Sequence, residues 1–196
     1  MSISRRDLIK SLSLTAAASS MQRVVPLAAA EMAHRRVSVA KAASFTGEYA
    51  PKFFTEHQYK TLRALCDAII PPDQESGGAL EADAPEFIDL LSSENKDLQL
   101  QLGGGIMWLD STCKERYGRT YLLCASGQRT EMLDLVAFRK NADQDPRLRP
   151  GIEFFATLRK YTADGFFTSK IGIKYLGYIG NTYLKEFPGC PAIPET

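Results

Sequence analysis

The chain has 196 residues, and 24 Lys and Arg face 23 Asp and Glu, so the formal net charge is +1. This balance gives no electrostatic reason to expect a nucleic acid or an anionic membrane surface as a partner. The length suits one domain that buries a core of its own.

The first 30 residues are typical of a twin-arginine export signal. Arg5 and Arg6 precede a short, mildly apolar stretch over residues 11–21, which is shorter than the roughly 20 apolar residues of a spanning helix. Three alanines at 28–30 supply the small residues that signal peptidase needs. We therefore expect folded export to the periplasm, cleavage near residue 30 and no membrane span afterwards. The mature chain would hold 20 basic and 22 acidic residues, a net charge of −2.

The remaining chain divides into an Ala-rich, basic linker or mobile arm over 31–52, a helical domain over 53–170 and a tail over 171–196. Apolar residues at helical spacing predict an all-α fold of about five helices around one core, with no run of alternating strand residues. We expect these helices over 55–70, from Asp83 onward, about 95–117, 126–140 and 150–167.

Local signals set several helix ends. Thr55 and Gln58 form a capping-box pattern, and Pro71-Pro72 must end that first helix at Ile70. Asp83 is suited to cap the second helix.

The remaining helices are predicted from their apolar spacing. The third carries an apolar stripe interrupted by Gly103-Gly104-Gly105, each glycine costing about 1 kcal/mol against Ala unless the backbone packs closely on another element. The fourth places Met132, Leu135, Val136 and Phe138 inward, and the fifth Phe154, Phe155, Leu158 and Tyr161.

The tail places tyrosines and a phenylalanine among glycines and prolines, so it cannot build a core alone. Exposed aromatic residues on irregular backbone are typical of protein interfaces. A tail that packs on its own domain is an equally weighted alternative. The residues that we predict to contact a partner are Phe166, Tyr175, Tyr178, Tyr183, Phe187 and Cys190.

The four cysteines allow three disulfide connectivities in an oxidising compartment. Cys113 and Cys124 are the local candidates, and their disulfide would be worth roughly 3 kcal/mol on the chain-entropy estimate. Cys66 falls on the apolar face of a predicted helix, which also favours a buried free thiol. Cys190 is suited to pair with Cys66 or with another chain.

The sequence offers no catalytic, cofactor-binding or metal-binding residues. His34 lies in the expected arm and His57 in the first turn of a helix, where a solvated position is the default, so a zinc site is not predicted. The phosphate-, dinucleotide- and haem-binding motifs and the hydrolase elbow are absent. The acidic pairs Glu86/Asp89 and Asp143/Asp145 are interpreted as helix starts and solvated loops. An independent enzyme is therefore the least favoured class.

Four stretches resemble the gluconate 2-dehydrogenase subunit 3 family. These are Phe53–Thr55 leading into Leu62–Pro71, then Ala84–Asp89, then Trp108–Asp110, and finally Gly165–Ser169 running to Leu176–Asn181. Their order and spacing cover roughly residues 53–189.

The resemblance implies a small, helical, non-catalytic subunit of a periplasmic sugar or polyol dehydrogenase. Its large partner would be an FAD-binding protein of the glucose–methanol–choline oxidoreductase type, and a cytochrome c subunit often takes the electrons onward. This explains why a signal for folded export precedes a chain with no visible cofactor site: the small subunit escorts the flavoprotein. Gluconate, glucose and glycosides remain open as substrates. The alternative from a different class is a stand-alone periplasmic helical binding or structural protein.

Overall fold

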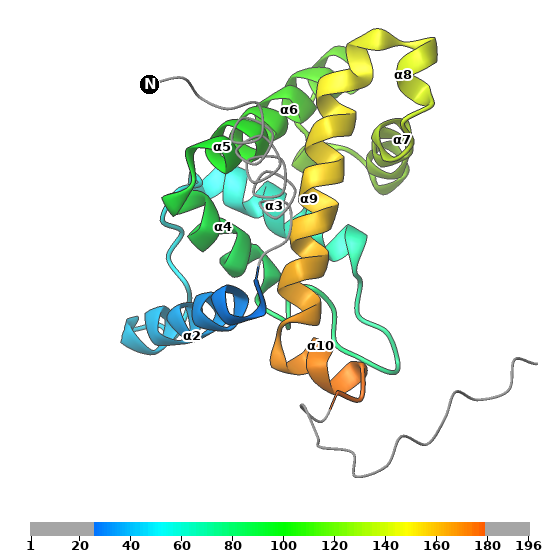
Figure 1. Ribbon diagram of the computed structural model, residues 1–196. Coiled ribbons are helices and arrows are strands. Elements are labelled where there is room, and N and C mark those ends of the chain that lie inside the picture. The colour runs from blue at the N-terminus through cyan, green and yellow to red at the C-terminus, as the bar shows by residue number, and fades with distance from the viewer. Residues whose placement is uncertain (1–25, 179–196) are drawn as a thin grey trace, which may run out of the picture.

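The computed structural model describes residues 26–178, and this part of the chain is built from helices alone (Figure 1). The predicted all-α fold class is confirmed. None of the helices in this part is long and apolar enough to cross a membrane. The elements are α2 (Leu27–Ala43), α3 (Glu56–Ile69), α4 (Ala84–Glu94), α5 (Lys96–Leu98), the π-helical η1 (Gln99–Gly103), α6 (Gly104–Tyr117), the 3₁₀ turn η2 (Tyr121–Leu123), α7 (Ser126–Ala137), α8 (Asn141–Gln144), the 3₁₀ turn η3 (Pro146–Leu148), α9 (Arg149–Phe167) and α10 (Lys170–Tyr175).

Helix α9 is the central element of the fold. It contacts α3, α4, α6, α7 and α10, and Figure 1 shows it running between them. Phe154, Phe155 and Leu158 are buried as their spacing predicts, and each such side chain contributes roughly 1.5–3 kcal/mol on burial. Tyr161 is partly buried and packs against the same core.

Residues 31–52 were predicted to form a linker or mobile arm. This prediction is wrong for most of the range, which belongs to a packed helix. Residues 27–43 form α2, which packs on α4 and buries Ala30, Ala33 and Val37. The buried side chains are short, so the apolar period of this helix is weak in the sequence. The cleavage site predicted near residue 30 lies in the first turn of α2.

The ends of α3 follow its local sequence. The Thr55 hydroxyl accepts a hydrogen bond from Gln58 N, and Gln58 Oε1 accepts one from Thr55 N at 3.1 Å, so the predicted capping box is confirmed. The helix ends at Ile69 with Ile70 as its C-cap, directly before the two prolines.

The start of α4 differs from the prediction. Asp83 occupies the N-cap position, but its side chain makes no capping hydrogen bond, and its φ of 57° places it in the left-handed region. Its carboxylate pairs instead with Lys41 of α2. An ion pair between distant segments has replaced the expected local cap.

The Gly103–Gly105 run does not break the third helical region, because η1 leads directly into α6. A Cβ on Gly105 would lie 2.0 Å from the Phe154 ring of α9, and a Cβ on Gly151 of α9 would lie 2.1 Å from the Trp108 ring of α6. The two helices therefore interlock, each glycine receiving an aromatic ring from the other helix. The predicted stripe of Leu98, Leu102, Ile106, Leu109 and Cys113 is buried.

Helix α7 is shorter than the predicted 126–140. Met132 and Val136 are buried and Leu135 is partly buried, as expected. Phe138 is 54% exposed, which corrects its predicted inward position. The helix ends at Ala137, and extended backbone at Phe138 turns its side chain away from the core.

Candidate functional site

The part of the chain between residues 26 and 178 contains no group of three or more His, Cys, Asp or Glu side chains that could hold a metal ion. We expected His34 to lie in a mobile arm, but it lies in the packed helix α2. Its ring stacks on Phe87 with the centroids 4.9 Å apart, and its Nε2 lies 3.0 Å from Thr168 Oγ1. Burial lowers the pKa of His34 below its ordinary value, so the neutral ring fits this structural position between α2, α4 and α9.

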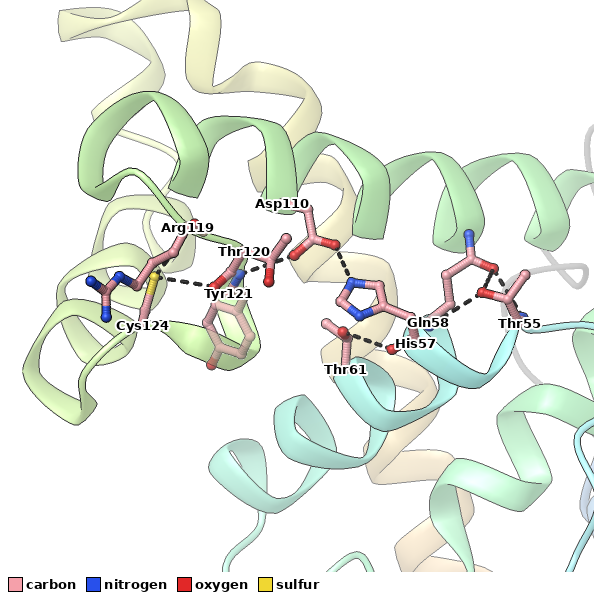
Figure 2. A network of polar contacts seen from close by, with 9 residues as sticks. All are labelled: Thr55, His57, Gln58, Thr61, Asp110, Arg119, Thr120, Tyr121 and Cys124. Atoms are coloured by element: carbon pink, nitrogen blue, oxygen red, sulfur yellow. Dashed lines mark hydrogen bonds and ion pairs between the residues drawn. The ribbon is translucent and has the colours of Figure 1, made fainter.

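The second histidine belongs to a polar network that the sequence did not predict (Figure 2). His57 Nε2 lies 2.6 Å from Asp110 Oδ2, and Asp110 Oδ1 accepts a hydrogen bond from Tyr121 N at 3.0 Å. His57 stands on α3, Asp110 on α6 and Tyr121 on η2, so the carboxylate joins three elements. His57 is about half exposed, in agreement with its predicted surface position.

A His–Asp pair can activate a nucleophile if a hydroxyl or thiol is hydrogen-bonded to the histidine. The hydrogen-bond partners of the neighbouring hydroxyls and thiol therefore indicate whether this pair has such a role. In Figure 2 the Thr61 hydroxyl donates to His57 O at 3.0 Å, and the Thr55 hydroxyl donates to Gln58 Oε1 at 3.0 Å. The Cys124 thiol is directed at backbone carbonyls, with Sγ 3.4 Å from Thr120 O. None of these three groups is bonded to His57 Nε2, and the pair acts as a clamp between elements.

Asp89 was interpreted together with Glu86 as part of a helix start, and the structure gives it a buried role instead. Its carboxylate is fully buried and accepts four hydrogen bonds, from the Tyr49 hydroxyl at 2.8 Å and the backbone N–H groups of residues 52, 53 and 54 at 2.7, 3.1 and 3.0 Å. Burial, followed by the nearby Asp89 carboxylate, raises the pKa of Tyr49. Asp89 thus ties the segment before α3 to α4.

Glu86, one turn before Asp89 on α4, is also buried. Its Oε1 accepts hydrogen bonds from the Tyr59 hydroxyl and from Arg63 Nη1, both at 2.9 Å. Both donors come from α3, so this carboxylate joins α3 to α4. The other pair is partly as predicted: Asp145 accepts from Arg147 N at the start of η3.

The predicted Cys113–Cys124 disulfide is not formed in the structure, where both residues are buried free thiols. Cys66 is also a buried free thiol, in agreement with its alternative prediction. Arg5, Arg6, Tyr183, Phe187 and Cys190 lie outside the described residues.

Exposed apolar side chains gather where α9 passes into α10. We call this the α10 surface, and it comprises Phe167, Tyr175, Leu176 and Tyr178, which are 40, 46, 58 and 49% exposed. Two exposed lysines, Lys170 and Lys174, stand on the same short helix. Exposed aromatic side chains with charged neighbours are the composition expected of a protein-binding surface.

Phe166 was predicted to contact a partner, but it is only 2% exposed, so this prediction is corrected. Its ring packs edge-on against Phe167 and Tyr175, with centroids 5.1 and 6.4 Å away. The burial of Phe166 could have been predicted from helical spacing, since Phe155, Leu158 and Phe166 fall on one face of α9. Phe167, one position later, faces outward in its place.

Helix α10 is held firmly on the end of α9. A Cβ on Gly172 would lie 2.1 Å from Phe166 O, so only glycine permits this approach. The Ser169 hydroxyl accepts a hydrogen bond from Gly172 N at 3.1 Å and caps the helix. The exposed rings of the α10 surface therefore stand on a fixed support. The tail predicted to be irregular from residue 171 is corrected over 171–175, which belong to α10.

The comparison with protein families gives one decisive match. The family model described as gluconate 2-dehydrogenase subunit 3 matches residues 56–189, more than half of the chain. This chain belongs to the gluconate 2-dehydrogenase subunit 3 family. Neither the curated proteins nor the solved structures contain a match.

The subunit 3 family match begins at the first residue of α3 and includes the α10 surface. Helix α2 lies before the matched range but contacts two residues inside it. Lys41 of α2 binds Asp83, and the ring of His34 stacks on Phe87. The family name describes a subunit of a gluconate 2-dehydrogenase complex, which calls for a surface that binds another subunit.

This subunit 3 family member also has an open groove of about 1230 Å³ between the α5–α6 region and α9, which the sequence did not predict. Trp108 and Phe154, the two rings of the glycine interlock, line it. Charges of both signs surround them, from Asp97, Arg139, Arg149, Glu153 and Lys160.

Proposed function

We propose that this chain is the non-catalytic small subunit of a periplasmic, FAD-dependent sugar or polyol dehydrogenase, which exports and stabilises the flavoprotein large subunit. The family match over residues 56–189 carries the proposal. The described part of the chain adds support, because the buried carboxylates of Glu86 and Asp89 and the ring of His34 hold its elements together. FAD would reside in a large subunit of the glucose–methanol–choline type, with a cytochrome c as an electron acceptor.

The escort role rests on the amino-terminal Arg5-Arg6 pair. The test is to replace both with Lys, co-express the large subunit and measure each chain and the flavin in periplasmic and cytoplasmic fractions. Arg23→Lys, which changes an arginine outside the pair, is the matched control. We expect the double variant to retain both chains in the cytoplasm and the control to export both. A large subunit that still reaches the periplasm with the double variant would refute the escort role.

We further propose that the large subunit binds the α10 surface. Three of its four exposed side chains are aromatic, the class that most often anchors protein interfaces. The chain also continues from this surface for the 18 residues 179–196, which carry Tyr183, Phe187 and Cys190. The remaining predicted contact residues thus follow the α10 surface in the sequence.

The interface is tested by Tyr175→Ala in the purified complex. An aromatic anchor costs about 2 kcal/mol or more on truncation, about a 30-fold rise in Kd. Leu100→Ala is the control, because Leu100 is 76% exposed in η1, which meets α9 near Thr157 and away from α10. Equal affinity of both variants for the large subunit would exclude the α10 surface as the contact.

Purification from the native host distinguishes the small-subunit role from the alternative function. A yellow complex with flavin absorbance supports the small-subunit role. A colourless monomer would favour a stand-alone periplasmic binding or structural protein.

A further inference from the structure

The end of α6 and the η2 turn bring two thiols together. Cys113 lies on α6, and Cys124 directly follows η2, after a reversal of the chain at Gly118, whose φ is 71°. Helix α6 packs against η2, and Cys124 is among the neighbours that raise the pKa of Cys113. Both are almost completely buried, at 0 and 5% exposure.

The pairing of these thiols is fixed by contacts that do not involve sulfur. Asp110, one turn before Cys113 on α6, accepts the hydrogen bond from Tyr121 N in η2 (Figure 2). The Tyr121 side chain is 1% exposed and anchors the turn in the core. The Cys124 thiol makes only weak hydrogen bonds, to Thr120 O at 3.4 Å and to Arg119 O at 3.8 Å. Joining the two sulfurs would therefore cost little in lost contacts.

We propose that Cys113 and Cys124 are an oxidation site, which closes to an intrachain disulfide after the folded chain enters an oxidising compartment. The oxidising compartment is inferred from the proposed function, whereas the pairing of Cys113 with Cys124 is inferred from the structure. The fold is complete while the thiols are free, as export in folded form from a reducing cytoplasm requires.

The chemistry is thiol–disulfide exchange with an oxidised protein dithiol or glutathione disulfide as the oxidant. Cys124 reacts first, because it is the less buried thiol and adjoins Leu123, which is 67% exposed. Its thiolate attacks one sulfur of the oxidant's disulfide, which breaks that bond, expels the other sulfur as a thiolate and leaves a mixed disulfide on Cys124. The Cys113 thiolate then attacks Cys124 Sγ, and the second sulfur of the oxidant leaves as a thiolate. Two thiol protons leave, and two electrons pass to the oxidant.

Burial, followed by the neighbouring Cys124, raises the pKa of Cys113 to about 12. The second exchange step in the folded chain should therefore be slow near neutral pH and faster as the pH rises.

Cys66 provides an internal comparison for these two thiols. It lies on α3 with Sγ 3.5 Å from Thr162 Oγ1 of α9 and is fully buried. Burial raises its pKa to about 12 as well. Cys66 should remain reduced under conditions that link Cys113 to Cys124.

Trypsin separates the cysteines, because each falls in a different expected peptide: 64–96, 97–114, 120–129 and 186–196. The exported chain is denatured in alkylating reagent, digested without reductant and analysed by mass spectrometry. We expect peptides 97–114 and 120–129 to appear joined, with the loss of two hydrogens, and to separate after reduction. The Arg5→Lys, Arg6→Lys chain from the cytoplasm is the matched control and should give both peptides alkylated.

Alkylated Cys113 and Cys124 in the exported chain, or their linkage to other cysteines, would overturn the proposal while leaving the small-subunit function intact. If the chain is not exported, the proposed function fails, and the pair is tested directly. The purified, reduced chain is then incubated with glutathione disulfide. Linkage of 97–114 to 120–129 supports the pair, and persistent free thiols across a pH series refute it.

Discussion

Two adjacent glycines in the same helix should respond in opposite directions to the same substitution. Gly104 and Gly105 open α6, and a Cβ built on Gly104 meets nothing within 4 Å apart from its chain neighbours and the backbone of its own helix. A Cβ built on Gly105 meets the Phe154 ring at 2.0 Å. Because both backbones are helical, the difference in their response to alanine measures the packing of α6 against α9.

The magnitudes follow from these contacts. Gly104→Ala should raise the free energy of unfolding by up to about 1 kcal/mol, the difference in helix propensity between Gly and Ala. Gly105→Ala gains the same propensity, but carbon atoms prefer separations of about 3.5–4.0 Å, so the Phe154 ring must retreat by about 1.5 Å. Overpacking typically costs about 1–3 kcal/mol, and losing the ring from the core would cost about 3–5 kcal/mol. We expect a net loss of about 2 kcal/mol for Gly105→Ala.

The assay is urea denaturation of the purified chain followed by far-ultraviolet circular dichroism, with the slope and midpoint fitted for each variant. A double-mutant cycle adds Phe154→Leu, which removes the ring and should reduce the cost of Gly105→Ala. The reasoning is refuted if Gly105→Ala is as stable as Gly104→Ala, or if its cost is unchanged beside Phe154→Leu.

Three further predictions concern the contacts that hold the helices. Asp89→Ala should lower the free energy of unfolding by at least about 3 kcal/mol in urea denaturation, because the buried Tyr49 hydroxyl and three backbone N–H groups lose their acceptor; a loss below 1 kcal/mol would contradict it. Burial holds the pKa of His34 below 6.5, so the unfolded chain binds the proton more readily, and stability present above pH 6.5 should be lost as the pH falls through the folded-state pKa. His34→Gln should flatten this dependence of the urea midpoint, and an unchanged slope would exclude His34 as its cause. Gly172→Ala should displace α10 from Phe166 and weaken binding of the large subunit while the far-ultraviolet spectrum stays nearly unchanged, and wild-type affinity would show that the position of α10 is unimportant.

The family was accessible from the sequence, because the resemblance depends on the order of short stretches along the chain. The exposed aromatic residues of the α10 surface, which we propose to bind the partner, were predictable only in part. Tyr175 and Tyr178 were predicted and are exposed, whereas Phe166 was predicted and is buried. Phe167 was missed, because two consecutive aromatics look equally suitable until the direction of the helix face is fixed by its packing.

The sequence by itself determined the features that depend on near neighbours. The capping box at Thr55, the end of α3 before Pro71 and the buried stripe of α6 all arise from residues a few positions apart. Such signals act within one or two helical turns, so they survive without knowledge of the rest of the fold.

Tertiary structure decided the features whose energy comes from distant residues. Asp83 follows a cap pattern, yet it binds Lys41, and helix α2 packs on α4, which is distant in the sequence. Asp89 looked like an ordinary acidic residue near a helix start until the chain brought four donors from residues 49–54 to its carboxylate. Gly104 and Gly105 are adjacent in the same glycine run, and only the position of Phe154 on another helix makes one of them necessary.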